Sequence, residues 1–183
     1  MIPLQVRLPI VGVMGSGNEP HTERAERLGV WLAELGVHLL TGGGGGVMTS
    51  VSRAYHLVSP RKGLVIGIIP ADPGETGGQS HEGYPNPWVE VPIFTHLPLR
   101  GDRGTEPMSR NHINVLSSDV IVALPGSAGT ASEVALALHY GRPLIAYLDN
   151  REQIPGLLDE IPVESELERI KEFVRTFLRD RDL

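Results

Sequence analysis

Short apolar runs rich in Val, Ile and Leu alternate along the chain with longer segments in which apolar residues recur every three or four positions. The runs are typical of buried strands, and the periodic segments are typical of helices packed on a sheet. The predicted strands cover residues 8–15, 37–42, 64–70, 89–95, 119–125 and 142–148. The predicted helices cover residues 22–36, 47–58, 108–118 and 131–141. Pro92 makes the run at 89–95 an edge or irregular strand, because proline cannot donate to a neighbouring strand.

This alternation predicts the α/β class, because apolar strands separated by helices form a parallel sheet that is covered on both faces. We expect a single Rossmann-like, doubly wound, mostly parallel sheet with helices on both faces. Residues 1–183 are expected to form one nucleotide-binding domain with its core at about 9–148. The amphipathic segment at about 163–180 is interpreted as a C-terminal packing helix, with a partner-binding helix as the alternative.

Composition and charge exclude several classes of function. The chain has 183 residues, a net charge of −6 and no cysteine. An acidic chain offers no electrostatic case for binding a nucleic acid polymer or an anionic membrane surface. The lack of cysteine excludes disulfides, thiolate metal sites and a cysteine nucleophile, and no histidine pair has the i, i+4 spacing of a helical zinc site. No apolar run reaches the ~18 residues of a membrane span, and the start lacks signal-peptide features, so we expect a cytoplasmic protein.

Three glycine-bearing turns follow predicted strands, at residues 15–17, 42–46 and 126–130. The last two lead into helices, whose free N–H groups and positive dipole end bind anions. A tight turn explains a single glycine equally well, but five in succession favour a phosphate-binding crevice because each glycine costs backbone entropy. The candidate phosphate-binding residues are Gly15, Ser16, Gly42, Gly43, Gly44, Gly45, Gly126, Ser127, Ala128, Gly129 and Thr130. The P-loop and G-x-G-x-x-G signatures are both missing, which excludes a P-loop enzyme and disfavours a dinucleotide dehydrogenase.

The two long loops predicted at about 71–88 and 96–107 are either functional lids or disordered.

Glu133 has two interpretations. Thr130 and Glu133 have the spacing of a capping box, in which Thr130 is the N-cap and Glu133 the third helical residue. Alternatively, Glu133 is the working carboxylate of an active site at the end of the strand 119–125. The capping box does not explain the small-residue turn before it, or the presence of Arg110 on the helix leading to the same strand.

Four segments together carry a family resemblance: GGGGGVM after the second strand, VIGIIP, SRN on a helix, and ALPGSAGTASE after an apolar strand. They resemble the Lonely Guy family of nucleoside 5′-monophosphate phosphoribohydrolases, and molybdenum-cofactor carrier proteins are similar in the same fold. The resemblance covers about residues 9–148. The sequence departs from the family pattern at Ser127, where the second glycine of the P-G-G motif is expected, and at Asn111, where the family has lysine. The departures place the chain in a divergent branch.

The resemblance implies hydrolysis of an AMP-like nucleoside monophosphate to free base and ribose 5-phosphate, without a metal or organic cofactor. It implies that Glu133 stabilises the developing sugar cation or activates water, that Arg110 assists it, and that the protein is a homodimer. Asn111 is a candidate ligand contact. The lysine decarboxylase label attached to many members does not fit, because Lys62 and Lys171 are the only lysines and neither is predicted at the carboxyl-end crevice.

Two other functions remain open at this point. A non-catalytic carrier of a nucleotide or of the molybdenum cofactor would use the same glycine turns without needing Glu133, and the substitution at Ser127 keeps this alternative open. A purely structural or interaction protein would bind no ligand in either turn. Release of free base from a nucleotide separates the enzyme from the carrier.

Overall fold

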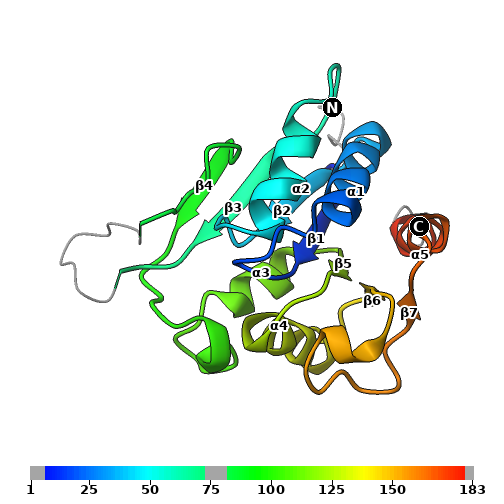
Figure 1. The fold of residues 1–183 in the computed structure, drawn as a ribbon. Helices are drawn as coiled ribbons and strands as arrows, with labels where there is room; N and C mark the ends of the chain where they lie inside the picture. The colour runs from blue at the N-terminus through cyan, green and yellow to red at the C-terminus, as the bar shows by residue number, and fades with distance from the viewer. Residues whose placement is uncertain (1–6, 73–81, 180–183) are drawn as a thin grey trace, which may run out of the picture.

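The computed structural model of the protein describes residues 7–72 and 82–179. Its strands form one parallel sheet in the order β4-β3-β2-β1-β5-β6-β7 (Figure 1). The strands are β1 (Ile10–Met14), β2 (His38–Thr41), β3 (Val65–Ile69), β4 (Val91–Phe94), β5 (Val120–Ala123), β6 (Leu144–Tyr147) and β7 (Val163–Glu164). The helices are α1 (Thr22–Leu35), α2 (Val47–His56), α3 (Asn111–Ser117), α4 (Ala128–His139) and α5 (Leu167–Arg179), with short 3-10 turns η1 (Gly101–Arg103) and η2 (Arg151–Gln153). The predicted α/β class and the Rossmann-like parallel sheet are confirmed.

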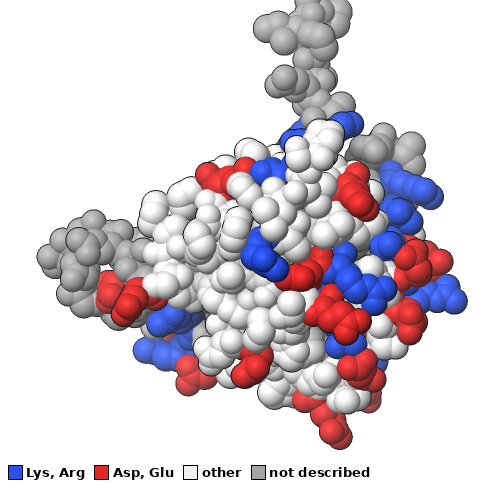
Figure 2. Space-filling view, turned by 45° about the horizontal axis from the view of Figure 1, so that its top comes forward, with Lys and Arg blue, Asp and Glu red and all other residues white. Residues whose placement is uncertain are grey.

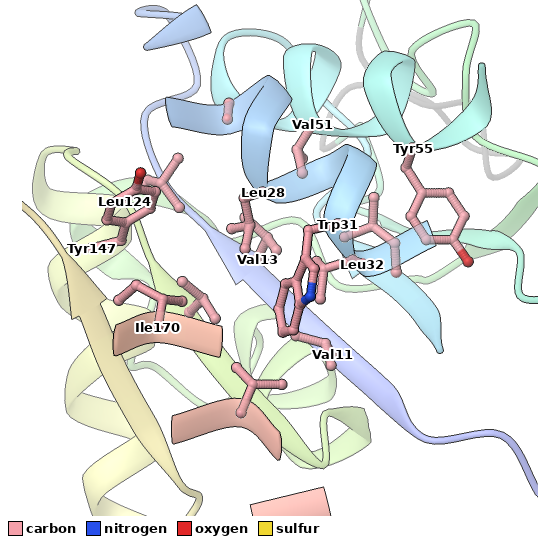
Figure 3. Close-up of a cluster of buried hydrophobic side chains, with 14 of the residues drawn as sticks. Val11, Val13, Leu28, Trp31, Leu32, Val51, Tyr55, Leu124, Tyr147 and Ile170 are labelled. Atoms are coloured by element: carbon pink, nitrogen blue, oxygen red, sulfur yellow. The ribbon is translucent and has the colours of Figure 1, made fainter. Parts of the chain in front are cut away.

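Helices cover both faces of the sheet, as the apolar strands predicted. α1, α2 and α5 pack on one face, and α3 and α4 pack on the other (Figure 1). Figure 3 shows the first of these layers, in which side chains from the sheet meet side chains from all three helices. Its labelled members are Val11, Val13, Leu28, Trp31, Leu32, Val51, Tyr55, Leu124, Tyr147 and Ile170. Because both faces are covered, the central strands carry apolar residues at successive positions instead of an alternating pattern.

The edges of the sheet differ in how well the sequence predicted them. β4 is an edge strand, as Pro92 indicated, and it pairs with β3 on one side only. The other edge is β7, which was not predicted: Val163 pairs with Ala146 of β6. The C-terminal helix therefore begins at Leu167 and not near residue 163, because the preceding residues extend the sheet. It packs on the core through Leu167, Ile170 and Val174.

The surface mixes charges of both signs. On the face shown in Figure 2, basic and acidic side chains of the described residues are interspersed. Among the described residues, charged side chains form ion pairs such as Arg24 with Asp149 and Arg53 with Glu26, each at 2.6 Å. In the described part of the chain, no helix has the length and apolar character that crossing a membrane requires.

Candidate functional site

The strand order creates a crevice beside β1. The chain builds β2, β3 and β4 on one side of β1 and then returns through α3 to place β5 on the other side. Ligands of open parallel sheets bind at such a reversal, outside the carboxyl ends of the strands. A cavity of about 580 Å³ lies there, a volume typical of sites for small molecules. Its lining comprises Val13, Met14, Gly15, Gly17, Asn18, Gly42, Gly45, Met48, Glu82, Gly83, Tyr84, Arg100, Gly101, Arg110, Asn111, Ser127, Gly129, Thr130 and Glu133.

The cavity brings most of the predicted site residues together from separate parts of the chain. Those that line it are Gly15, Gly42, Gly45, Arg110, Asn111, Ser127, Gly129, Thr130 and Glu133. Those outside its lining are Ser16, Gly43, Gly44, Gly126 and Ala128. Ser16 instead shapes the first turn, because its hydroxyl accepts hydrogen bonds from the backbone N–H groups of Asn18 and Glu19.

The amino end of α4 forms one wall of the cavity. The helix begins at Ala128, and its N-cap is Ser127, whose side chain makes no capping hydrogen bond. The first N–H groups of a helix have no acceptor within the helix, so those of Ala128, Gly129 and Thr130 are suited to an anion. The side chain of Thr130 packs against Gly126, where a Cβ atom would overlap its hydroxyl.

The glycine run at 42–46 is explained by close packing around the cavity. A Cβ atom at Gly42 would overlap the guanidinium of Arg110, and one at Gly44 would lie 2.6 Å from the ring of Tyr84. At Gly43, with φ of 74°, it would overlap Ile69. Small size is thus required here to seat two side chains of the cavity wall, and anion binding is not needed to account for the run.

Arg110 is a buried cation without a partner for two of its nitrogens. It precedes α3 as the N-cap residue and is only 4 % exposed. Its Nε and Nη1 atoms have no hydrogen-bond acceptor among residues 7–72 and 82–179. Leaving buried donors of a charged group unpaired is costly, so the guanidinium is suited to an anionic ligand in the cavity.

Glu133 accepts a hydrogen bond from a residue of α3 and does not take part in capping α4. Because α4 begins at Ala128, Glu133 is its sixth residue and Thr130 its third, so the capping box is not formed. Glu133 is 7 % exposed, and its Oε1 atom accepts a hydrogen bond of 2.8 Å from Nδ2 of Asn114. Desolvation by burial raises the pKa of Glu133, against the opposing effects of the Arg110 charge and the Asn114 hydrogen bond. A buried carboxyl group with a raised pKa at a cavity wall is suited to acid–base work.

The raised pKa of Glu133 predicts how the free energy of unfolding depends on pH. A carboxyl group whose pKa is higher in the folded than in the unfolded chain contributes stability below the unfolded pKa, and this is lost as pH rises through the folded pKa. Glutamine resembles the neutral acid and does not titrate. Relative to wild type, Glu133→Gln should therefore gain stability as pH rises.

Urea unfolding of both proteins between pH ~4 and ~8 measures this difference. Glu34→Gln, at an exposed position on α1, is the control and should show no comparable trend. If the free energy of unfolding of Glu133→Gln, relative to that of wild type, stays constant or falls as pH rises, the assignment is contradicted.

Several cavity residues were not predicted, and Tyr84 and Arg100 are the most prominent. They come from the two long loops. The guanidinium carbon of Arg100 lies 5.5 Å from the centre of the Tyr84 ring, and its Nη1 lies 3.4 Å from the phenolic oxygen. The loops carry no periodic pattern that would place these side chains; the only signal was the unusual length of the loops.

Among the described residues, no group of three or more His, Asp or Glu side chains could hold a metal ion.

Known proteins share this architecture along most of the chain. A molybdenum cofactor binding protein from Rippkaea orientalis is 33 % identical, with a TM-score of 0.74 over 95 % of this chain and 99 % of that one. The Moco carrier protein from Chlamydomonas reinhardtii is 29 % identical, with a TM-score of 0.69 over 95 % and 99 %. An uncharacterised protein from Archaeoglobus fulgidus is 33 % identical over 139 residues, which are 75 % of this chain and 78 % of that protein.

The family follows from a match along the sheet and its helices. The sequence profile of the SLOG cluster4 family matches residues 8–172, which include every strand of the described structure and the start of α5. This match and the two molybdenum-cofactor proteins confirm the resemblance to the Lonely Guy type of fold and to its divergent branch. The chain belongs to the SLOG cluster4 family.

Proposed function

We propose that this protein binds a phosphorylated heterocyclic compound in the cavity beside β1, and that the molybdenum cofactor is its cargo. The observation that carries the proposal is Arg110, a buried guanidinium at the cavity wall with two nitrogens that lack an acceptor among the described residues. A protein that kept such a group for stability alone would leave its donors unpaired at a cost.

The other cavity walls support a ligand with an anionic end. The amino end of α4 contributes backbone N–H groups from the turn at 127–130, and the helix dipole favours negative charge there. Tyr84 contributes an aromatic ring at the same cavity, on which a flat heterocycle can stack. A phosphate and a flat ring system are the two parts common to nucleotides and to the pterin of the molybdenum cofactor.

The choice of the molybdenum cofactor rests on the two relatives named for it, which are 33 % and 29 % identical and are covered almost completely. In this role, Arg110 and the turn at 127–130 would bind the anionic groups of the cofactor. To test this, the purified protein is mixed with cofactor released from a molybdoenzyme and passed through a desalting column. We expect pterin, detected by its fluorescence, and molybdenum to elute with the protein in equal molar amounts. Elution of protein without either would overturn the proposal.

Hydrolysis of a nucleoside 5′-monophosphate is the second candidate, and Glu133 favours it. A carrier has no evident use for a buried carboxyl group at its ligand cavity, and the structure does not use Glu133 as a helix cap. Breaking the N-glycosidic bond develops positive charge on the ribose, which a carboxylate stabilises. As this bond breaks, the water oxygen adds to the anomeric carbon and Glu133 takes a proton from that water. The same proton passes on to the departing base, so the products are free base and ribose 5-phosphate and Glu133 is ionised again.

Incubation with AMP and a panel of other nucleoside monophosphates tests this second candidate. Chromatography should detect free base that forms in proportion to the protein concentration. If wild-type protein binds these nucleotides but releases no base, hydrolysis is excluded and the carrier function stands.

We further propose that the protein is a homodimer that pairs through α3, α4 and the segment before α3. Met108 and Leu116 are large apolar residues in this region that are 45 % and 44 % exposed. Light scattering at micromolar concentration should report about twice the chain mass of 19.8 kDa.

A charged residue in this interface should separate the subunits, because an ionised group loses its hydration when it is buried. Leu116→Asp is expected to give a folded monomer. Leu57→Asp, at an apolar residue that is 61 % exposed just after α2, is the control and should remain dimeric. A wild-type protein that is monomeric at every concentration would disprove the assembly.

A further inference from the structure

Helix α3 presents two side chains to Glu133. Arg110 at its N-cap and Asn114 within it are four residues apart, so they lie on the same side of the helix. The Arg110 charge acts on the Glu133 carboxyl group, and Asn114 donates a hydrogen bond of 2.8 Å to it. Asn114 is fully buried and does not line the cavity itself, so it stands behind Glu133.

We propose that Asn114 is the positioning residue of this site: it fixes the Glu133 carboxyl group at the cavity wall and favours its ionised form. The proposal rests on the function proposed for Glu133 at the ligand. A hydrogen bond donated to a carboxylate stabilises the charged form, and it does so more strongly where water is excluded.

The contacts of Asn114 separate this role from simple packing. In the described part of the chain, the hydrogen bond to Glu133 is the one that its side chain makes, and its Oδ1 atom has no partner. Its other contact of note is made by the backbone, because the Ser118 hydroxyl donates to the Asn114 carbonyl oxygen. A side chain kept only to fill space would be apolar here, since a buried amide oxygen without a partner is unfavourable.

The other charged groups near Glu133 do not supply the same hydrogen bond. Arg110 influences Glu133 through its charge, and its Nε and Nη1 atoms make no hydrogen bond to Glu133 or to any other described residue. Glu82, Tyr84 and Arg100 are the remaining titratable residues of the cavity lining, and they come from the two loops instead of from α3 or α4. Replacing Asn114 should therefore leave the Glu133 carboxylate with Arg110 as its main stabilising group.

A direct titration of Glu133 tests the proposal without any ligand. In protein labelled with ¹³C at glutamate side-chain carboxyl carbons, the Glu133 signal is identified by its loss in Glu133→Gln. In Asn114→Leu, which keeps the volume but donates no hydrogen bond, the titration midpoint should rise by ~1 pH unit or more, the scale of one hydrogen bond to a buried charge. Ser118→Ala, which removes a buried hydroxyl at the C-cap of α3, is the control, and the Glu133 midpoint in it should equal that of wild type.

Asn114→Asp provides a second test should the leucine variant not fold. Two adjacent carboxyl groups share a proton, so the Glu133 signal should titrate in two steps, the higher of them above the wild-type midpoint. If the protein hydrolyses nucleotides, the acid limb of the kcat profile should move with the midpoint while KM stays within about twofold. A Glu133 midpoint that is the same in wild type and in the folded Asn114 variants would overturn the proposal. The result does not depend on which ligand, if any, the cavity binds.

Discussion

Replacing Arg110 by methionine should strongly weaken the binding of ligand while leaving the ligand-free protein folded. The guanidinium is buried with two unpaired nitrogens, so the folded protein loses no hydrogen bond from them when it is removed. A bound phosphate, in contrast, would lose a charge-assisted, buried contact, for which a loss of ~10²-fold in affinity is the expected scale. The methionine side chain fills much of the space that the Arg110 side chain occupies beside Gly42.

Two further variants separate charge, geometry and packing at this position. Arg110→Lys keeps the positive charge but lacks the planar fork, and it should bind ligand more weakly than wild type and better than Arg110→Met. Arg53→Met removes an exposed arginine of α2 that pairs with Glu26, and it should bind ligand as wild type does. Affinity is measured by fluorescence titration with the cofactor or with AMP, and stability by urea unfolding. A variant Arg110→Met that binds as tightly as wild type would remove the main support for an anion site.

The architecture was predictable because each buried strand is apolar at successive positions. β1, β2, β3, β5 and β6 were all predicted within two residues of their observed ends, since few other elements combine such short apolar runs with flanking helical segments. Pro92 identified the edge strand through a local chemical property, its missing N–H group. β7 was missed because it comprises only Val163 and Glu164, and their extended form depends on pairing with β6.

Most of the residues predicted for the site line one cavity, but several local details around them were not predicted. Capping-box spacing at Thr130 and Glu133 is a local signal, but α4 begins three residues closer to the strand than that pattern indicates, at Ala128 instead of residue 131. The start of the helix depends on how the turn packs, as with Thr130 against Gly126, and a local pattern does not contain such contacts. The packing role of the glycine run was not predictable from local sequence either. The side chains that require small residues there belong to Arg110 and Tyr84, which are far away in sequence. Asn114 had one usable signal, its spacing of four residues from Arg110 on a predicted helix.

Glu133→Gln should lower any nucleotide hydrolysis by at least ~10²-fold and leave nucleotide binding nearly unchanged. Glutamine keeps the shape of the side chain and its ability to pair with Asn114, but it neither carries negative charge nor accepts a proton from water. Binding should persist because the phosphate contacts proposed here come from Arg110 and the amino end of α4. Base release and affinity for AMP are measured on the same preparation, and unfolding in urea verifies that the variant is folded.

The double variant Glu133→Gln with Arg110→Met distinguishes two ways in which these residues could contribute. If they act on the same step of one reaction, the loss of activity in the double variant should be much smaller than the product of the two single losses. If Arg110 serves only to bind the phosphate, the single variant should raise KM at nearly constant kcat, and the two effects should multiply. Hydrolysis by Glu133→Gln at the wild-type rate would show that Glu133 has no part in catalysis. The raised pKa of its carboxyl group would then be a consequence of burial alone.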